Sequence, residues 1–84
     1  MARDLMDVAR KVLARLPKST TEKAAAEAIR REFQRGSSIQ YVAREIVTDD
    51  RGGYKIYSVK DGGGYSFRVS KDTHGKLNIS IYHG

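Results

Sequence analysis

The feature that most constrains the fold of this chain is a change in the spacing of its apolar residues at Gly36. Before Gly36, apolar residues recur every three or four positions, as they do on one face of an α-helix. Well after it, apolar and polar residues alternate in short runs between glycine-containing loops, as in antiparallel strands. The 84 residues are enough for a single domain. We therefore predict one α+β domain over residues 1–84, with a helical part at 4–35 and a β-meander at about 39–83.

Two helices are expected in the helical part. The first begins at Asp4, whose carboxylate suits the positive end of a helix dipole, and ends before Pro17. The second is expected to begin with a capping box, in which Ser19 accepts a hydrogen bond from the amide of Glu22, and to end at Gly36. This second helix is expected to carry an apolar face, made of Ala25, Ala28, Ile29 and Phe33, and an ion pair between Glu27 and Arg31.

Residues 38–48 allow two interpretations, and the choice decides the architecture. We favour a strand, because a hairpin loop at 49–53 and a strand-like run from Tyr54 follow at once. Two helices would then cover one face of a three- or four-stranded antiparallel meander. As a helix, the segment would complete a winged helix-turn-helix, a fold that reads the major groove of DNA. The residues that would then face the groove are Gln40, Tyr41, Arg44 and Glu45.

The later strands predict a polar outer sheet face. Alternation places one set of side chains together on it, namely Ser66, Arg68, Asn78, Ser80 and Tyr82, with Lys55 and Tyr57 as further members. Cations, an amide and tyrosines can bind phosphates and stack on bases. Polar residues of this kind are also what the wet face of any antiparallel sheet carries.

The net charge of +6 favours partners with negative charge, such as nucleic acid or an acidic protein surface. Most of the excess lies before Gly36, where helix-borne arginines could follow a phosphate backbone. Glutamates interspersed among these cations are equally typical of an ordinary solvated helix. The candidate binding residues are Arg10, Arg15, Lys23, Arg30, Arg31, Arg35, Arg68 and Tyr82.

Little in the sequence points to catalysis. The chain has no cysteine and only two histidines, His74 and His83, so we expect no metal site, no cofactor and no catalytic residue. The glycines at 62–64 lack the lysine of a phosphate-binding loop and predict a turn. Apolar runs are far shorter than the ~20 residues of a spanning helix, and the first residues lead into a charged pattern. We expect a cytoplasmic protein without membrane contact.

One enzymatic alternative comes from a resemblance. The segment from Gly75 to His83, Gly-Lys-Leu-Asn-Ile-Ser-Ile-Tyr-His, resembles the end of the RelE/ParE-type toxin fold, in which two helices also precede an antiparallel sheet. The resemblance implies a ribonuclease, with Arg68 stabilising a phosphate and His83 acting as general acid.

Three functions are therefore compatible with the sequence. The leading hypothesis is a small, non-enzymatic, basic protein that binds nucleic acid or a complex that handles nucleic acid. The alternative is a protein inhibitor or adaptor of the kind that phage and plasmid genes encode, with tyrosines as interface anchors. The ribonuclease toxin is the second alternative. In each case we expect a monomer or a weak homodimer.

Overall fold

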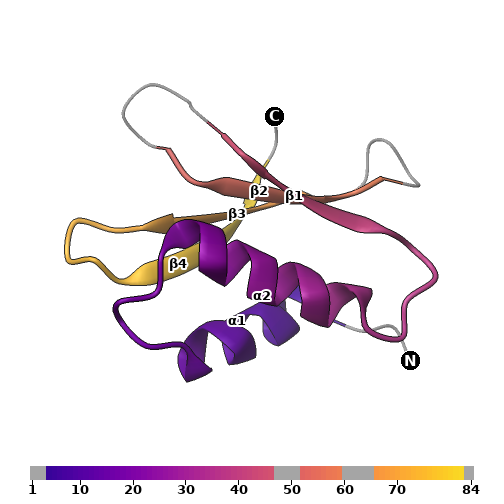
Figure 1. Cartoon of the computed structure of the whole chain (residues 1–84), viewed down its shortest axis with the longest axis horizontal. Coiled ribbons are helices and arrows are strands. Elements are labelled where there is room, and N and C mark those ends of the chain that lie inside the picture. Colours follow the sequence, from indigo (N-terminus) through magenta and orange to yellow (C-terminus); the bar gives the residue numbers. More distant parts are fainter. Residues whose placement is uncertain (1–3, 47–51, 60–65, 83–84) are drawn as a thin grey trace.

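Two helices lie on the same side of a four-stranded antiparallel sheet in the computed structural model, which describes residues 4–46, 52–59 and 66–82 (Figure 1). The elements are α1 (Leu5–Arg15), α2 (Glu22–Gln34), β1 (Tyr41–Glu45), β2 (Tyr54–Ser58), β3 (Ser66–Lys71) and β4 (Leu77–Tyr82). The strands are ordered β1-β2-β3-β4, so each pairs with its neighbour in the chain. The predicted α+β meander covered by helices is confirmed.

The helix starts follow from local hydrogen bonding. The Asp4 carboxylate accepts from the amides of Met6 and Asp7 at 3.1 and 3.3 Å, which confirms it as the cap of α1. The predicted cap of α2 was wrong. Thr21, not Ser19, is the cap, and its Oγ1 accepts from the amide of Ala24 at 3.1 Å. Because α2 begins at Glu22, the residue in the capping position is Thr21, and Ser19 lies two residues before that position.

One of the side-chain predictions for α2, the ion pair of Glu27, is wrong, and the other, its apolar face, is confirmed. Glu27 pairs with Arg30 at 3.0 Å instead of with Arg31, because positions three apart on a helix are neighbours as well as positions four apart. Ala28 is only partly buried and lies at the edge of the core. The fully buried face of α2 consists of Ala25, Ala26, Ile29 and Phe33.

The segment after α2 is extended, so the winged helix-turn-helix alternative was wrong. Tyr41 is buried, and its ring packs edge-to-face with that of Phe33 at a centroid distance of 5.3 Å. The side chain of Gln34 donates to the Ile39 carbonyl at 2.9 Å and accepts from the Tyr41 amide at 2.8 Å. These two bonds hold the backbone extended in the way that a neighbouring strand would. The predicted hairpin loop at 49–53 lies mostly outside the described residues.

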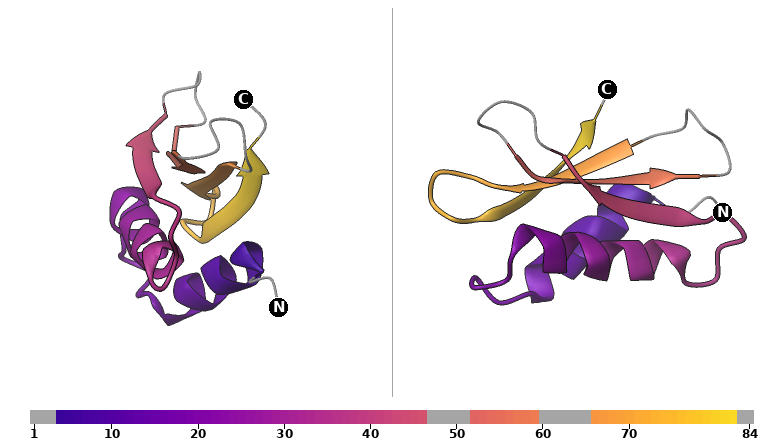
Figure 2. Two further views of the ribbon diagram at one scale, coloured as in Figure 1. Left: turned by 90° about the vertical axis from the view of Figure 1, so that its right-hand side faces the viewer. Right: turned by 45° about the horizontal axis from the view of Figure 1, so that its top comes forward.

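The core lies between the helices and the inner sheet face. α2 packs against β1, β2 and β3, whereas α1 packs against α2 and β4, and both views of Figure 2 keep the helices on one side. Phe33 is central, since its ring also meets Phe67 of β3 at 5.4 Å. Ile29, Ile56 and Val69 complete the fully buried centre. The opposite sheet face therefore has no helix over it in the part of the chain that is described.

Candidate functional site

The sheet face turned away from the helices, here called the outer face, brings cations of three strands into one row. The pairing register places Arg44 of β1 opposite Lys55 of β2, and Lys55 opposite Arg68 of β3. Ser80 of β4 ends the row beside Arg68. Like charges directly opposite each other are unfavourable in a sheet, so local strand pairing alone does not favour this row.

An aromatic ring lies beside this row. Tyr57 is half-buried on the outer face, where Lys55 Nζ lies 5.4 Å from its ring centroid and the Arg44 guanidinium carbon lies 6.0 Å from it. Both distances fall within the range of cation–π attraction. By register Tyr57 lies opposite Val42 of β1 and Ser66 of β3.

No carboxylate residue occupies an outer-face position in the described strands. The residues at these positions are Val42, Arg44, Lys55, Tyr57, Ser66, Arg68, Ser70, Asn78, Ser80 and Tyr82. The register confirms the predicted grouping, and it adds Arg44, which the sequence had placed only in the rejected helical alternative. The backbone of Tyr82 belongs to this face, but its side chain lies outside the described residues.

Arg68 has a second contact that fixes its position. Its Nε donates to the Gly52 carbonyl at 3.0 Å, and the neighbouring guanidinium nitrogen reaches the same oxygen. Arg68 is partly buried, unlike Arg44, which is exposed. Arg68 therefore joins the outer face to the backbone just before β2. The histidine that the toxin resemblance would pair with it, His83, lies outside the described residues.

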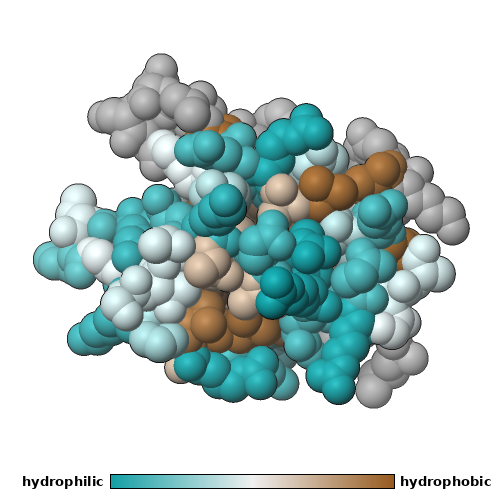
Figure 3. Space-filling model, viewed as in Figure 1, coloured by the Kyte–Doolittle hydropathy of each residue, from teal (hydrophilic) through white to brown (hydrophobic). Residues whose placement is uncertain are grey.

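The six predicted helical cations are distributed over several places. Arg15 is exposed in the last turn of α1, and Lys23 is exposed in the first turn of α2. Arg30 is partly buried and paired with Glu27, while Arg31 and Arg35 are exposed near the end of α2. In the space-filling view, taken from the same side as Figure 1, hydrophilic side chains cover most of the surface around smaller apolar patches (Figure 3).

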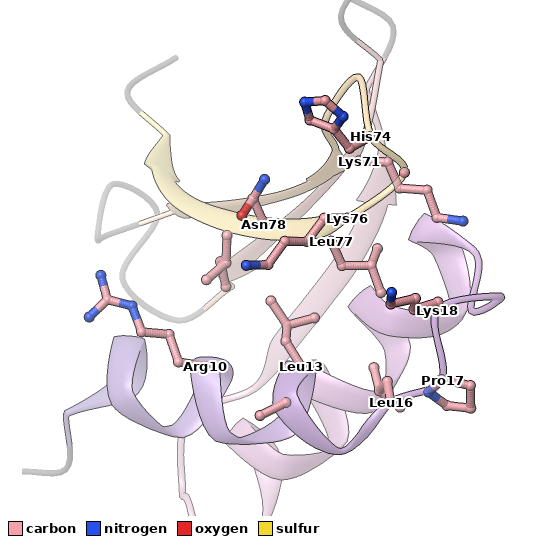
Figure 4. A pocket seen from close by; sticks show the side chains of 13 residues that line it. Arg10, Leu13, Leu16, Pro17, Lys18, Lys71, His74, Lys76, Leu77 and Asn78 are labelled. Carbon is pink, nitrogen blue, oxygen red and sulfur yellow. The ribbon is translucent and has the colours of Figure 1, made fainter.

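The remaining helical cation, Arg10, lines an open groove that the sequence did not predict. The groove lies between α1, the segment after α1 and the β3–β4 hairpin, and its volume is about 980 Å³ (Figure 4). Leu13, Leu16, Leu77 and Ile79 give it apolar walls, and Arg10, Lys18, Lys71 and Lys76 bring positive charge. These residues come from opposite ends of the chain, so no local pattern in the sequence could have grouped them.

The β3–β4 turn beside the groove is organised by Asp72. Its Oδ1 accepts from the amides of His74 and Lys76 at 2.8 and 2.9 Å, and its Oδ2 accepts from the Asn78 side chain at 3.3 Å. The Lys76 amide is the largest cause of a lowered pKa at the Asp72 carboxyl, and the bonds from His74 and Asn78 lower it further. This carboxylate serves the turn, and His74 is exposed on the same turn.

Comparisons with family models, curated proteins and solved structures found no match to this chain. Among the described residues, no three His, Cys, Asp or Glu side chains form a group that could hold a metal ion. No helix in the described ranges is both long enough and apolar enough to cross a membrane.

Proposed function

We propose that the protein binds single-stranded nucleic acid on the outer face of its sheet. The observation that carries this proposal is the row of Arg44, Lys55 and Arg68 beside Tyr57, on a face whose described positions include no carboxylate residue. Cations neutralise phosphates, and an aromatic ring stacks on a base whatever its identity. Together they supply the two interactions that binding without sequence preference requires.

The shape of the surface favours a single strand over a duplex. The major groove of DNA admits one helix or a two-stranded ribbon, whereas this surface is a four-stranded sheet. Bases in a duplex are also stacked on one another and cannot stack on Tyr57. Strands in a sheet lie about 4.8 Å apart, so a row across three strands spans about 10 Å, enough for a few nucleotides.

The test is a fluorescence-anisotropy titration with labelled single-stranded and duplex DNA and RNA. At about 50 mM salt we expect micromolar or tighter binding to the single strands, and much weaker binding at about 200 mM, because each phosphate contact releases a counterion. The variant Arg44→Ala/Lys55→Ala should weaken binding by about tenfold, at roughly 0.7 kcal/mol for each cation.

The matched control removes the same charge from the other side of the molecule. Lys23→Ala/Arg31→Ala takes two exposed cations from α2 and leaves the outer face intact. We expect its affinity to stay within about twofold of the wild type. Equal losses in the two double variants would show that only net charge matters, and absence of binding to every nucleic acid at low salt would overturn the proposal.

A further inference from the structure

The two edges of the sheet differ in charge. β1 and β4 are the end strands, and no other strand pairs with their outer edges in the described ranges. β1 contains Arg44 and Glu45, and charged side chains on an edge strand are a common protection against pairing with another chain. β4, with the sequence Leu-Asn-Ile-Ser-Ile-Tyr, contains neither a charge nor a proline. β4 is therefore the edge that is open to an additional strand.

The groove runs along this same edge. Leu77 and Ile79 of β4 face the helices and form its wall on the sheet side, and Leu13 points toward them from α1 (Figure 4). Ile81 follows on the same face of β4 and is 46% exposed, so the apolar surface continues beyond the groove. A strand added beside β4 would direct every second side chain onto this apolar surface.

Four cations surround the apolar surface, whereas the two carboxylates that lie beside it are hydrogen-bonded to backbone amides. The carboxylate of Glu22 accepts from the backbone amide of Lys71 at 3.0 Å, and that of Asp72 is bonded within the turn. None of the four groove cations, Arg10, Lys18, Lys71 and Lys76, forms an ion pair with a described residue. The groove thus complements a partner whose own charge is negative.

We infer that β4 accepts an extended, acidic segment of a partner protein as a fifth strand of the sheet. Backbone hydrogen bonds to β4 supply affinity, apolar side chains of the segment fill the groove, and its carboxylates meet the groove cations. A second copy of this chain fits less well, since each copy carries a net charge of +6. The site uses residues other than Arg44, Lys55 and Tyr57, so peptide binding at β4 can be tested independently of nucleic-acid binding on the outer face.

The probe is a labelled peptide of alternating valine and glutamate, about eight residues long to match an ordinary strand. We expect it to bind, and a peptide of alternating valine and lysine to bind at least about tenfold more weakly. Methylating alternate backbone nitrogens of the acidic peptide removes the donors of one edge and should also cost at least about tenfold. In ¹H–¹⁵N spectra, the amides of β4 should shift and exchange more slowly, whereas those of β1 should not.

Two charge-reversed proteins locate the site. Arg10→Glu/Lys76→Glu should lose at least about tenfold in affinity for the acidic peptide, whereas Lys23→Glu/Arg31→Glu on α2 should lose much less. Circular dichroism spectra like that of the wild type are required of both variants before their affinities are compared. The inference would be overturned if the acidic peptide did not bind, or if the methylated peptide bound equally well. Amide chemical-shift changes in β1 and not in β4 would also overturn it. A dimer of the free chain with protected β4 amides would assign the edge to a second copy and would overturn it as well.

Discussion

The guanidinium of Arg68 on β3 donates to the backbone carbonyl of Gly52, with 3.0 Å between Nε and oxygen. This cation of the outer face is therefore also a support for the backbone that enters β2. Replacing Arg68 would change the loop and the charge together, which makes Arg44 and Lys55 the cleaner probes of ligand binding. Gly53 follows Gly52 in the chain and lies close to the side chain of Arg68, so there is little room for a larger residue at this position.

Gly53→Ala should destabilise the protein strongly. Gly53 has φ of +117°, and an added Cβ would lie 2.8 Å from the Val69 carbonyl oxygen and 3.1 Å from Arg68 Nε. We expect a loss of about 3 kcal/mol in the free energy of unfolding, from backbone strain and overpacking. Gly75→Ala is the control, since φ is +76° but no atom lies within 4 Å of the added Cβ. Gly75→Ala should lower the free energy of unfolding by about 1 kcal/mol, measured by urea titration. Similar losses in both variants would contradict the steric explanation.

Tyr57→Leu should reduce affinity for single-stranded nucleic acid, whereas Tyr57→Phe should not. The expected loss for leucine is about tenfold, because stacking on an aromatic ring contributes about 1–3 kcal/mol for each base. Phenylalanine keeps the ring and the cation–π contacts with Lys55 and Arg44. Anisotropy titrations of the three proteins at one salt concentration provide the measurement. A loss of the same size in the phenylalanine variant would mean that the hydroxyl, and not the ring, is recognised.

Gln34→Glu should destabilise the junction between α2 and β1. Glutamate has nearly the same shape, but an ionised carboxylate cannot donate to the Ile39 carbonyl as the Gln34 amide does at 2.9 Å. We expect a loss of about 1–3 kcal/mol on chemical unfolding at neutral pH. Gln40→Glu, at a nearby exposed position, makes the same chemical change and should have little effect. Equal stability of the two variants would show that the Gln34 bonds are dispensable.

Acid should loosen the β3–β4 turn through Asp72. Since the folded-state pKa of Asp72 is lowered, its ionised form stabilises the turn above the ordinary aspartate pKa, and this stabilisation is lost as the pH falls through the lowered value. NMR titration should give a lower midpoint for the Asp72 carboxyl than the same residue shows in an unfolded peptide. The Lys76 amide should exchange faster once Asp72 is protonated. An unshifted midpoint would contradict the hydrogen bonding described for this turn.

Local patterns predicted the helices and the sheet faces because the forces behind them act over a few residues. The cap at Asp4 and the alternation through Phe67 and Val69 belong to this class. Tyr41–Glu45 was ambiguous, because an edge strand that carries Arg44 and Glu45 does not alternate cleanly. The bonds from Gln34 that hold this segment extended join residues five and seven positions apart, from the end of α2 to the start of β1, so they follow no repeat within a single element.

The candidate surfaces were harder to predict than the fold. Alternation placed Arg68 and Lys55 on one face, but only the pairing register shows that Arg44, Lys55 and Arg68 form one row. The groove depends on the approach of α1 to β4, which brings Leu13 near Leu77. Contacts between distant segments of a chain follow no regular spacing in the sequence, so the sequence alone did not predict the groove.

Both proposed surfaces depend on the register of β4. Its odd-numbered residues, such as Leu77 and Ile79, give the groove its apolar wall, whereas Asn78 and Ser80 take outer-face positions, and Asn78 also lines the groove. A slip of one residue would exchange the two sets, because side chains alternate along a strand. The turn that Asp72 holds fixes this register, so inserting one residue there would leave leucine and isoleucine in water and polar groups against α1. The length of this short turn is therefore as strict a requirement as the identity of any residue in either surface.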